Sequence, residues 1–448
     1  MQDLTQGPIR SHILKMSLPI AIGMIIQTFY YLVDLYFVGA LGDVALAGVS
    51  SAGNIAFLVI GLTQILNVGT VSLISQAVGR KDKQEANLIF NQSLMISTIL
   101  GLLMLVLGIA IADSYLSFVA ADEATIESGR SYFIWFLPNL ALQFALVAMG
   151  ASLRGTGIVK PTMVVQMVSI LINILLAPIL ISGWLTGYAM GVAGAGLASS
   201  IAAVVAVILL WVYFHRLEHY VAFDYKLFIP QSRKWRKIIA VGFPSGGEFL
   251  LMFIYMAVIY WVIKDFGVDS QAGFGLGSRI MQAIFVPALA IAFALPAIVG
   301  QNFGAQNPDR VRDAFKQAVI MVSLIMAIIN ALAIWQPEIL FHPFTNDPEV
   351  LKVAVIFISI ISFNFVPSGI IFTCSGLFQG LGNAWPSLIS TSTRLLSFAI
   401  PAIWLSHQPN FTLEKLWYLS MGTVIFQSLF SLFLARREMN KRLTVSLN

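Results

Sequence analysis

The sequence predicts an all-α polytopic membrane protein of about 12 transmembrane helices in two six-helix bundles, related by a pseudo-twofold axis along the membrane normal. Of its 448 residues, 58% are hydrophobic and only 10% are charged, whereas soluble domains carry about 25% charged residues. Apolar stretches long enough to cross ~30 Å of hydrocarbon recur along the chain. Because lipid offers no partner to backbone polar groups, each stretch must be a helix. A repeat within the sequence, described below, predicts the two bundles.

The spans are expected where apolar runs lie between polar or helix-breaking residues. In the first half they cover residues 12–40, 47–76, 88–112, 126–151, 161–183 and 191–215. In the second half they cover residues 238–264, 271–301, 312–335, 350–380, 386–406 and 412–436. We therefore expect an N-terminal lobe over 1–215, a flexible cytoplasmic linker over 216–237 and a C-terminal lobe over 238–448.

Several classes of protein are excluded by what the sequence lacks. The single cysteine, Cys374, rules out an internal disulfide and a cysteine-cluster metal site. No long polar insertion leaves room for a nucleotide-binding domain, so the chain by itself is not an ATP-driven pump. Residues 1–8 lack a basic region, and no cleavage site follows the first apolar run, so we expect no cleaved signal peptide.

The lysines and arginines predict the orientation in the membrane. With these spans, 20 of the 26 lie on one side, and four lie on the other: Arg130, Lys264, Lys352 and Lys415. Because cytoplasmic loops carry the excess of positive charge, both termini are expected in the cytoplasm of a bacterial inner (plasma) membrane. The net charge of +5 then reflects anchoring against the lipid bilayer, and no nucleic acid partner is expected.

The chain repeats itself at an offset of 225 residues. The matching segments are 75–79 with 300–304, 154–157 with 379–382, Pro19 with Pro244, and Gly42 with Gly267. Each half has an even number of spans, so the copies point the same way across the membrane, as in parallel-repeat transporters. Two bundles suit alternating access by rocking; a purely structural pair of bundles is the other reading, and the intramembrane acids favour transport.

An isolated acid marks the first helix. Gln27, Tyr30 and Asp34 are spaced i, i+3 and i+7, so they share one helix face. Pro19 removes one backbone hydrogen bond and predicts a bend. We interpret Asp34 as an acid that exchanges a proton or an ion for substrate; the alternative is a carboxylate satisfied by neighbouring hydroxyls or amides.

Three motifs together resemble the multidrug and toxic compound extrusion (MATE) family of the MOP flippase superfamily. They are the stretch VDLYFVGALG over 33–42 with Ala45-Leu46-Ala47-Gly48 after it, the stretch VGQNFGA over 299–305 with Pro308, Arg310 and Arg312, and the paired turns at 154–157 and 379–382. The resemblance covers the whole chain. It implies antiport of organic cations or related drugs against protons or sodium, by a protein that is no enzyme and needs no cofactor.

The resemblance also implies a cation site in the first half. The family uses an acid on the first helix, a tyrosine, an asparagine and a hydroxyl, and these positions match Asp34, Tyr132, Asn173 and Ser199. A second acid is common four residues after the asparagine, where this sequence has Ala177. A lone carboxylate with little water around it favours its protonated form, so we expect a proton as the coupling ion. The alternative is sodium at Asp34, because one carboxylate, carbonyls and water can also bind it; no other metal is expected.

Three further charges lie inside the second half. Glu248 resembles an acid that many family members carry on the seventh helix, whereas Ser368 stands where some members have a second acid. Arg394 is a candidate ion-pair partner that would make Glu248 structural, and the functional and structural interpretations of Glu248 stay open. Arg279 is expected to be a packed, paired arginine.

The predicted function is the export of small-molecule drugs, mainly cationic, by a monomer. A lipid or polysaccharide-precursor flippase of the same superfamily is the first alternative, but the sequence has no cluster of intramembrane arginines to hold a phosphate. An intramembrane enzyme is more remote, because the spans contain no HExxH, no GxSxG and no paired aspartates. A channel is disfavoured because no continuous polar pore is evident.

Overall fold

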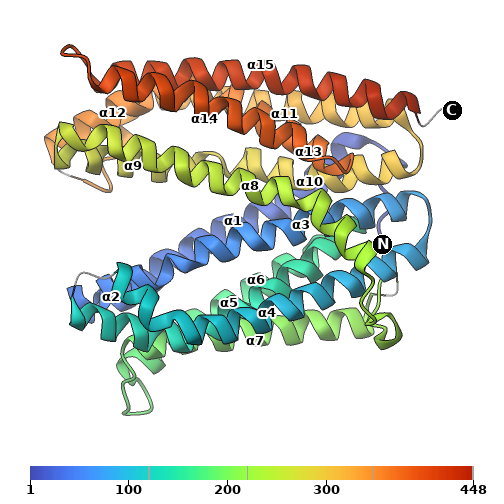
Figure 1. Ribbon diagram of the computed structural model, residues 1–448, viewed down its shortest axis with the longest axis horizontal. Coiled ribbons are helices and arrows are strands. Elements are labelled where there is room, and N and C mark those ends of the chain that lie inside the picture. The colour runs from blue at the N-terminus through green and yellow to red at the C-terminus, as the bar shows by residue number, and fades with distance from the viewer. Residues whose placement is uncertain (120–121, 219, 346, 446–448) are drawn as a thin grey trace. The chain divides into compact units, whose positions relative to one another are not determined.

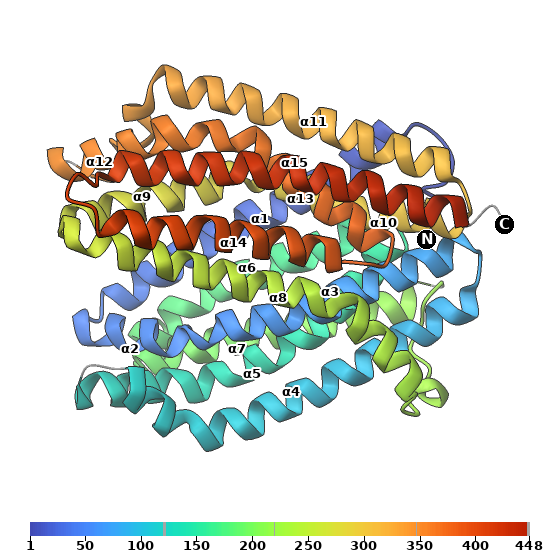
Figure 2. The same ribbon diagram turned by 45° about the horizontal axis from the view of Figure 1, so that its top comes forward.

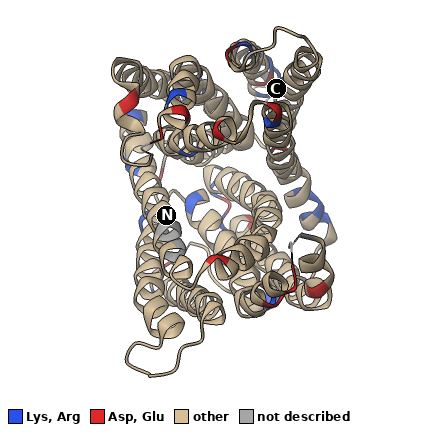
Figure 3. Ribbon diagram, turned by 90° about the vertical axis from the view of Figure 1, so that its left-hand side faces the viewer, with Lys and Arg blue, Asp and Glu red and all other residues tan. Residues whose placement is uncertain are grey.

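The computed structural model describes the backbone of residues 1–119, 122–218, 220–345 and 347–445; within these ranges, the side chains at 30–32, 34–35, 119 and 444–445 lie outside the description. The described part contains 12 helical spans that are long and apolar enough to cross a membrane, and it contains no strand. The predicted all-α fold with 12 spans is therefore confirmed. Charged residues are sparse, and most of the ribbon in Figure 3 is uncharged.

The first six spans are formed by seven helices (Figure 1). These are α1 (Ile9–Gly39), α2 (Asp43–Gly53), α3 (Ile55–Gly79), α4 (Lys83–Val119), α5 (Glu123–Gly155), α6 (Lys160–Ser182) and α7 (Val192–Arg216). The second span consists of α2 and α3, with a break at Asn54. Gly53 precedes the break, and glycine is among the weakest helix formers.

The remaining spans are formed by α8 to α15. The elements are η1 (Tyr225–Leu227), α8 (Ser232–Ile263), η2 (Lys264–Phe266), α9 (Val268–Ile284), α10 (Val286–Gly304), α11 (Pro308–Trp335), η3 (Pro337–Leu340), α12 (Pro348–Ile361), η4 (Ser362–Asn364), α13 (Phe365–Gly380), α14 (Trp385–Ser406) and α15 (Leu413–Val445). Two predicted spans are broken in two: α9 and α10 meet at Phe285, and α12 and α13 are joined by η4. Pro287 and Pro367 follow these breaks, and each lacks the N–H that a continuous helix would need.

The 225-residue repeat is visible in the backbone. Gly42 precedes α2 with φ 105° and ψ 173°, and Gly267 precedes α9 with φ 91° and ψ 175°. Gly157 and Gly382, which follow α5 and α13, have φ 82° and 75°. These dihedral angles are accessible mainly to glycine, so the repeat preserves the turns that join successive spans.

A matching pair of turns uses residues other than glycine. Lys81 and Gln306, which follow α3 and α10, have φ 60° and 57°. In both turns the next amide N–H donates to the carbonyl five residues back at 2.9 Å, from Asp82 to Ala77 and from Asn307 to Asn302. This is the Schellman arrangement that satisfies the last carbonyls of a helix. Both halves therefore end this helix in the same way.

The chain packs as two compact units. The N-terminal unit contains Met1–Asp3 and Ile22–Gly242, and the C-terminal unit contains Leu4–Ala21 and the chain from Phe243 onward. These bounds differ from the predicted lobes, because α1 and α8 each contribute to both units. The division falls beside Pro19 in α1 and beside Pro244 in α8.

Polar contacts explain why the start of the chain belongs to the C-terminal unit. Leu4 is fully buried, and its N–H donates to Gln301 Oε1 at 2.9 Å. Its carbonyl oxygen accepts from Asn302 Nδ2 at 3.1 Å, and Arg310 Nη2 donates to the carbonyl of Gly7 at 3.1 Å. The residues that precede α1 are thus held by α10 and α11.

The linker between the repeats is held by a buried glutamine on α4. Gln92 Nε2 donates to the carbonyl oxygens of Leu227 at 2.6 Å and Ile229 at 2.9 Å. Its Oε1 accepts from the backbone N–H of Gln231 at 3.0 Å and from Trp235 Nε1 at 2.7 Å. Gln92 is fully buried, so these four bonds satisfy its amide without water.

Two other residues of α4 strengthen this attachment. Asn91 Nδ2 donates to the carbonyl of Ala222 at 2.9 Å, and Lys234 Nζ lies 2.6 Å from Glu85 Oε1 in an ion pair. The linker over 216–237 is therefore bound to α4 at several points, and its flexibility stays a prediction. The polar composition of the segment does not distinguish a free segment from one whose polar groups bind a neighbouring helix.

The core of each unit is built by helices that lie side by side. In the N-terminal unit α5 packs against α3, α4 and α7, and in the C-terminal unit α14 lies along α15 (Figure 2). The C-terminal core contains an aromatic group in which Trp417 stacks on Phe274 at 5.4 Å and meets Phe357 edge-on at 4.9 Å.

Candidate functional site

Three predicted site residues of the N-terminal unit lie buried on neighbouring helices. Asn173 on α6 donates from Nδ2 to Ser199 Oγ on α7 at 3.2 Å. Tyr132 on α5 is 4% exposed, and its ring stacks on Phe136 at 4.9 Å. The structure thus brings Asn173 and Ser199 together in direct contact.

A glycine brings α7 close to α5. A Cβ atom at Gly196 would lie 2.6 Å from the carbonyl oxygen of Tyr132, which is shorter than any real contact of this kind. Gly196 lies three residues before Ser199, so the same helix face carries the close approach and the hydroxyl. The glycine at 196 therefore allows α7 to approach the backbone of α5 and to place the Ser199 hydroxyl inside the unit.

The position of the absent second acid is apolar. Ala177 lies one helical turn after Asn173 and is fully buried. A methyl group there offers neither charge nor hydrogen bonds, so Asn173 and Ser199 supply neutral groups only. This arrangement can orient a ligand through hydrogen bonds, but at position 177 it adds no charge to neutralise a bound cation.

The acid-bearing face of the first helix is described only in part. Helix α1 is continuous from Ile9 to Gly39 with Pro19 inside it. Gln27 accepts a hydrogen bond from Gln166 Nε2 on α6 at 3.3 Å, so this face of α1 points toward α6. The side chains of Tyr30 and Asp34 lie outside the described ones, and their roles stay predictions, as does the bend at Pro19.

Glu248 is half-buried on α8 of the C-terminal unit. Ser387 and Ser375 lie beside its carboxyl group, and Ser387 Oγ donates to Ser375 Oγ at 2.9 Å. The other face of the carboxyl group is less well supported, because Oε1 is buried with no partner among the described residues. Even low estimates of the free-energy cost of a charged side chain at the centre of a membrane are about 2.5–3.5 kcal/mol. This cost favours protonation or a bound ion here.

Glu248 and Arg394 do not form the ion pair that was considered from the sequence. None of the ion pairs between described residues includes either side chain. Arg394 instead lies over the ring of Tyr255, with Cζ 4.4 Å from the ring centroid.

The separation follows from helix geometry. Tyr255 is seven residues after Glu248 on α8, and Arg394 is seven residues after Ser387 on α14. Since Ser387 meets Glu248 and Arg394 meets Tyr255, the acid and the arginine lie two helical turns apart, or about 10 Å along the axes. Arg394 therefore does not neutralise Glu248.

Two further predictions are resolved in the same unit. Arg279 on α9 is exposed, so the expected packing of this arginine is wrong. It joins no ion pair with a described residue. Ser368, where some family members have an acid, is 8% exposed on α13. The buried neighbourhood of α13 thus contains a hydroxyl in place of a second charge.

The sequence reasoning missed Ser375, Ser387 and Tyr255. Serine and tyrosine are common in membrane helices, and nothing in their spacing marks them before α8, α13 and α14 are placed together. Arg154 enters the sequence analysis only as part of the repeated turn at 154–157. In the structure Arg154 Nη2 donates to Asn67 Oδ1, so the end of α5 is bound to α3.

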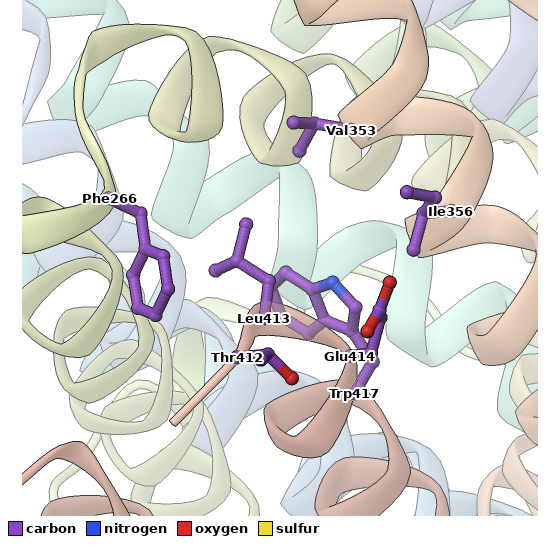
Figure 4. Close-up of a pocket in the computed structure, with 7 residues that line it drawn as sticks. All are labelled: Phe266, Val353, Ile356, Thr412, Leu413, Glu414 and Trp417. Carbon is purple, nitrogen blue, oxygen red and sulfur yellow. The ribbon is translucent and has the colours of Figure 1, made fainter. Parts of the chain in front are cut away.

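The C-terminal unit also contains a small pocket of about 270 Å³. Figure 4 shows the lining side chains near the start of α15, which are Phe266, Val353, Ile356, Thr412, Leu413, Glu414 and Trp417. None of the predicted site residues lines it. Its lining is mostly apolar with one carboxylate, and we assign it no role in the site.

The duplicated helical units and their buried polar groups define a polytopic membrane transporter. A model of the MatE family matches residues 19–179 and 244–405, two segments whose starts differ by the repeat offset. The chain therefore belongs to the MatE family, whose members are transporters and not enzymes.

Two relatives are similar to this chain over most of their length. The FAD transporter of Shewanella oneidensis is 23% identical, with 89% of this chain and 88% of that protein covered. The "Probable multidrug resistance protein NorM" of Thermotoga maritima is 25% identical, with 88% and 84% covered.

Solved structures agree with the fold. The crystal structure of MATE in the bent conformation has a TM-score of 0.92 and 26% identity, covering 99% of this chain and 98% of that one. A MOP superfamily transporter from Pyrococcus furiosus has a TM-score of 0.90 and 25% identity, covering 98% of each chain.

Proposed function

We propose that the protein exports organic cations and related drugs from the cytoplasm in exchange for protons. It is a multi-pass membrane protein of 12 spans, and the proposal places it in the bacterial inner membrane as a monomer with both termini in the cytoplasm. The names of relatives such as NorM and the multidrug export protein MepA of Staphylococcus aureus support drug efflux.

The observation that supports proton coupling is the neutral polar cluster of the N-terminal unit. Asn173, Ser199 and Tyr132 are buried there, and Ala177 removes the second carboxylate. A sodium ion in such a place would need several oxygen ligands and compensating charge, whereas a single carboxyl group suffices to carry a proton. Asp34 is the acid that we assign to this task.

Proteoliposomes with the purified protein and ethidium, a fluorescent organic cation, test the proposal. A pH gradient alone should drive ethidium exchange, and a sodium gradient alone should not. Asp34→Asn should lower the proton-driven rate at least tenfold at equal protein level, whereas Asp43→Asn, which changes an exposed acid at the start of α2, should retain it.

Three outcomes would count against the proposal. Exchange driven by sodium alone would indicate that Asp34 binds sodium. Normal proton-driven exchange by Asp34→Asn would indicate that a residue other than Asp34 carries the proton. Flipping of lipid-linked precursors without ethidium exchange would favour the flippase.

A further inference from the structure

Arg394 is a cation in the middle of a membrane span. It is the tenth residue of α14, so it lies about 14 Å along the axis from Trp385 at the start of the helix. That depth is close to the centre of a hydrocarbon layer of ~30 Å. The phosphates of the lipids lie at the surface of this layer and are therefore far from the guanidinium group.

The structure holds this side chain in one place. The guanidinium lies over the ring of Tyr255 with Cζ 4.4 Å from the centroid. Tyr255 is itself fixed, because its hydroxyl lies 3.0 Å from Ser420 Oγ and its ring packs at 4.7 Å on Phe398, which is fully buried. Tyr255 is thus a rigid platform for the face of the guanidinium group.

The edge of the guanidinium group has no hydrogen-bond acceptor among the described residues. Its buried Nε lacks a hydrogen-bond partner among the described residues, and no described carboxylate lies within ion-pair distance. Glu248 is two helical turns away, as shown above. The side chain is only half-buried, so its terminal N–H groups, unlike the buried Nε, are the ones that a ligand can reach.

A fixed guanidinium fork with free N–H groups matches a specific ligand chemistry. Its donors fit the two oxygens of a carboxylate or a phosphate ester, and such charge-assisted pairs are among the strongest hydrogen bonds in proteins. A cationic ligand would be repelled by the same group. An oxyanion would supply the counter-charge that the unit itself does not supply.

We propose that Arg394, held on Tyr255, binds the oxyanion of a transported molecule, so that the substrates include anionic or zwitterionic aromatic compounds. This rests on the proposed transport of small organic molecules and goes beyond the export of cations. Arg394 is thereby a substrate-binding residue of the C-terminal unit.

Binding to the purified transporter in nanodiscs tests this inference with ligands of one shape. Isothermal titration should show that 2-naphthoate binds at least tenfold more tightly than the neutral 2-naphthamide, with empty nanodiscs as the reference. 2-Naphthyl phosphate tests the second oxyanion, and 2-naphthylmethylammonium provides the cationic ligand.

Arg394→Gln should remove the preference for naphthoate and leave binding of the ammonium ligand within twofold. Arg394→Lys should retain part of the preference, because the charge stays and the fork is lost. Arg312→Gln removes an equal charge from an exposed site and should keep the full preference. Elution as a monodisperse peak and an unchanged melting temperature establish that each variant is folded.

Equal affinity of the wild type for naphthoate and naphthamide would overturn the inference. So would an Arg394→Gln variant that binds every ligand as the wild type does, or one that loses all of them alike. Binding of the ammonium ligand without a preference for the oxyanions would overturn this inference and leave cation export standing. Binding of the oxyanions alone would support Arg394 and contradict cation export.

Discussion

Intramembrane charges differ in this protein by what surrounds each one. Glu248 lies beside two serines, Arg394 lies over an aromatic face, and Arg154 donates to the amide oxygen of Asn67. No described partner of these three carries an opposite charge. A neutral partner can orient a charged group without cancelling it, so Glu248 and Arg394 remain able to respond to a proton or a ligand.

Glu248→Gln should therefore leave folding nearly unchanged. No ion pair is broken and an amide can bond to both serines, so we expect a loss of stability of no more than about 1 kcal/mol. Fluorescence-detected size exclusion and thermal unfolding measure the yield and the melting temperature. A sharp fall in both would show that Glu248 has a charged partner after all.

Glu438→Gln is the matched comparison. Glu438 is 7% exposed, and its Oε1 accepts from Arg442 Nε at 2.5 Å and from Asn383 Nδ2 at 2.8 Å. Removing its charge leaves Arg442 without its charged partner, which we expect to cost about 1–3 kcal/mol, because the pair is partly exposed. A melting temperature for Glu438→Gln equal to that of Glu248→Gln would contradict this account.

At the scale of residues, the contact between Asn173 on α6 and Ser199 on α7 could be expected only through the family resemblance. The common face of Gln27 and Asp34 is an expectation from the 3.6-residue period alone. The separation of Glu248 from Arg394 depends on the register of α8 against α14, which no periodicity within either helix reveals. For the same reason Tyr255 and the two serines carried no signal before the helices were placed.

At the scale of the elements, hydrophobic length predicted the spans and local backbone chemistry decided their interruptions. A run of about 20 apolar residues is a strong signal, because the small free energies of transferring each residue into the membrane add up. A single proline, such as Pro287 or Pro367, leaves that sum almost unchanged and yet removes a backbone donor. The twelve spans were therefore predicted, whereas the breaks in three of them were not.

The attachment of the linker to α4 gives the clearest prediction at this scale. Gln92→Met keeps the volume of the side chain and removes four hydrogen bonds to the linker and Trp235, which should cost about 2–4 kcal/mol. Trypsin should then cleave at Lys226 or Arg233 several times faster than in the wild type. Gln84→Met, at an exposed position on the same helix, is the control and should be cleaved at the wild-type rate; equal rates for all three proteins would contradict a bound linker.

At the scale of the whole molecule, the repeat is the organising feature. The same glycine dihedral angles and Schellman turns recur 225 residues apart, and the family match begins at Pro19 and again at Pro244. Each of these prolines lies inside a helix that both units share. The repeat therefore includes the places where the chain passes from one unit to the other.

The membrane orientation is testable with single cysteines after Cys374 is replaced. Ser232 and Asn410 are both exposed, and the charge bias predicts that they lie on the cytoplasmic and outer sides, respectively. An impermeant thiol reagent should label Asn410→Cys in intact spheroplasts and should label Ser232→Cys only after lysis. The opposite pattern would reverse the assignment of both termini.

The C-terminal unit includes Leu4–Ala21. The second repeat alone therefore lacks one helical segment of its unit. During synthesis the ribosome delivers this helical segment first and the rest of its unit more than 220 residues later. The segment can therefore bind α10 and α11 only after these helices have been synthesised. Halves made as separate polypeptides would each lack a helical piece that the other half encodes, so a gene cut between the repeats should yield a working protein only when both fragments are produced together.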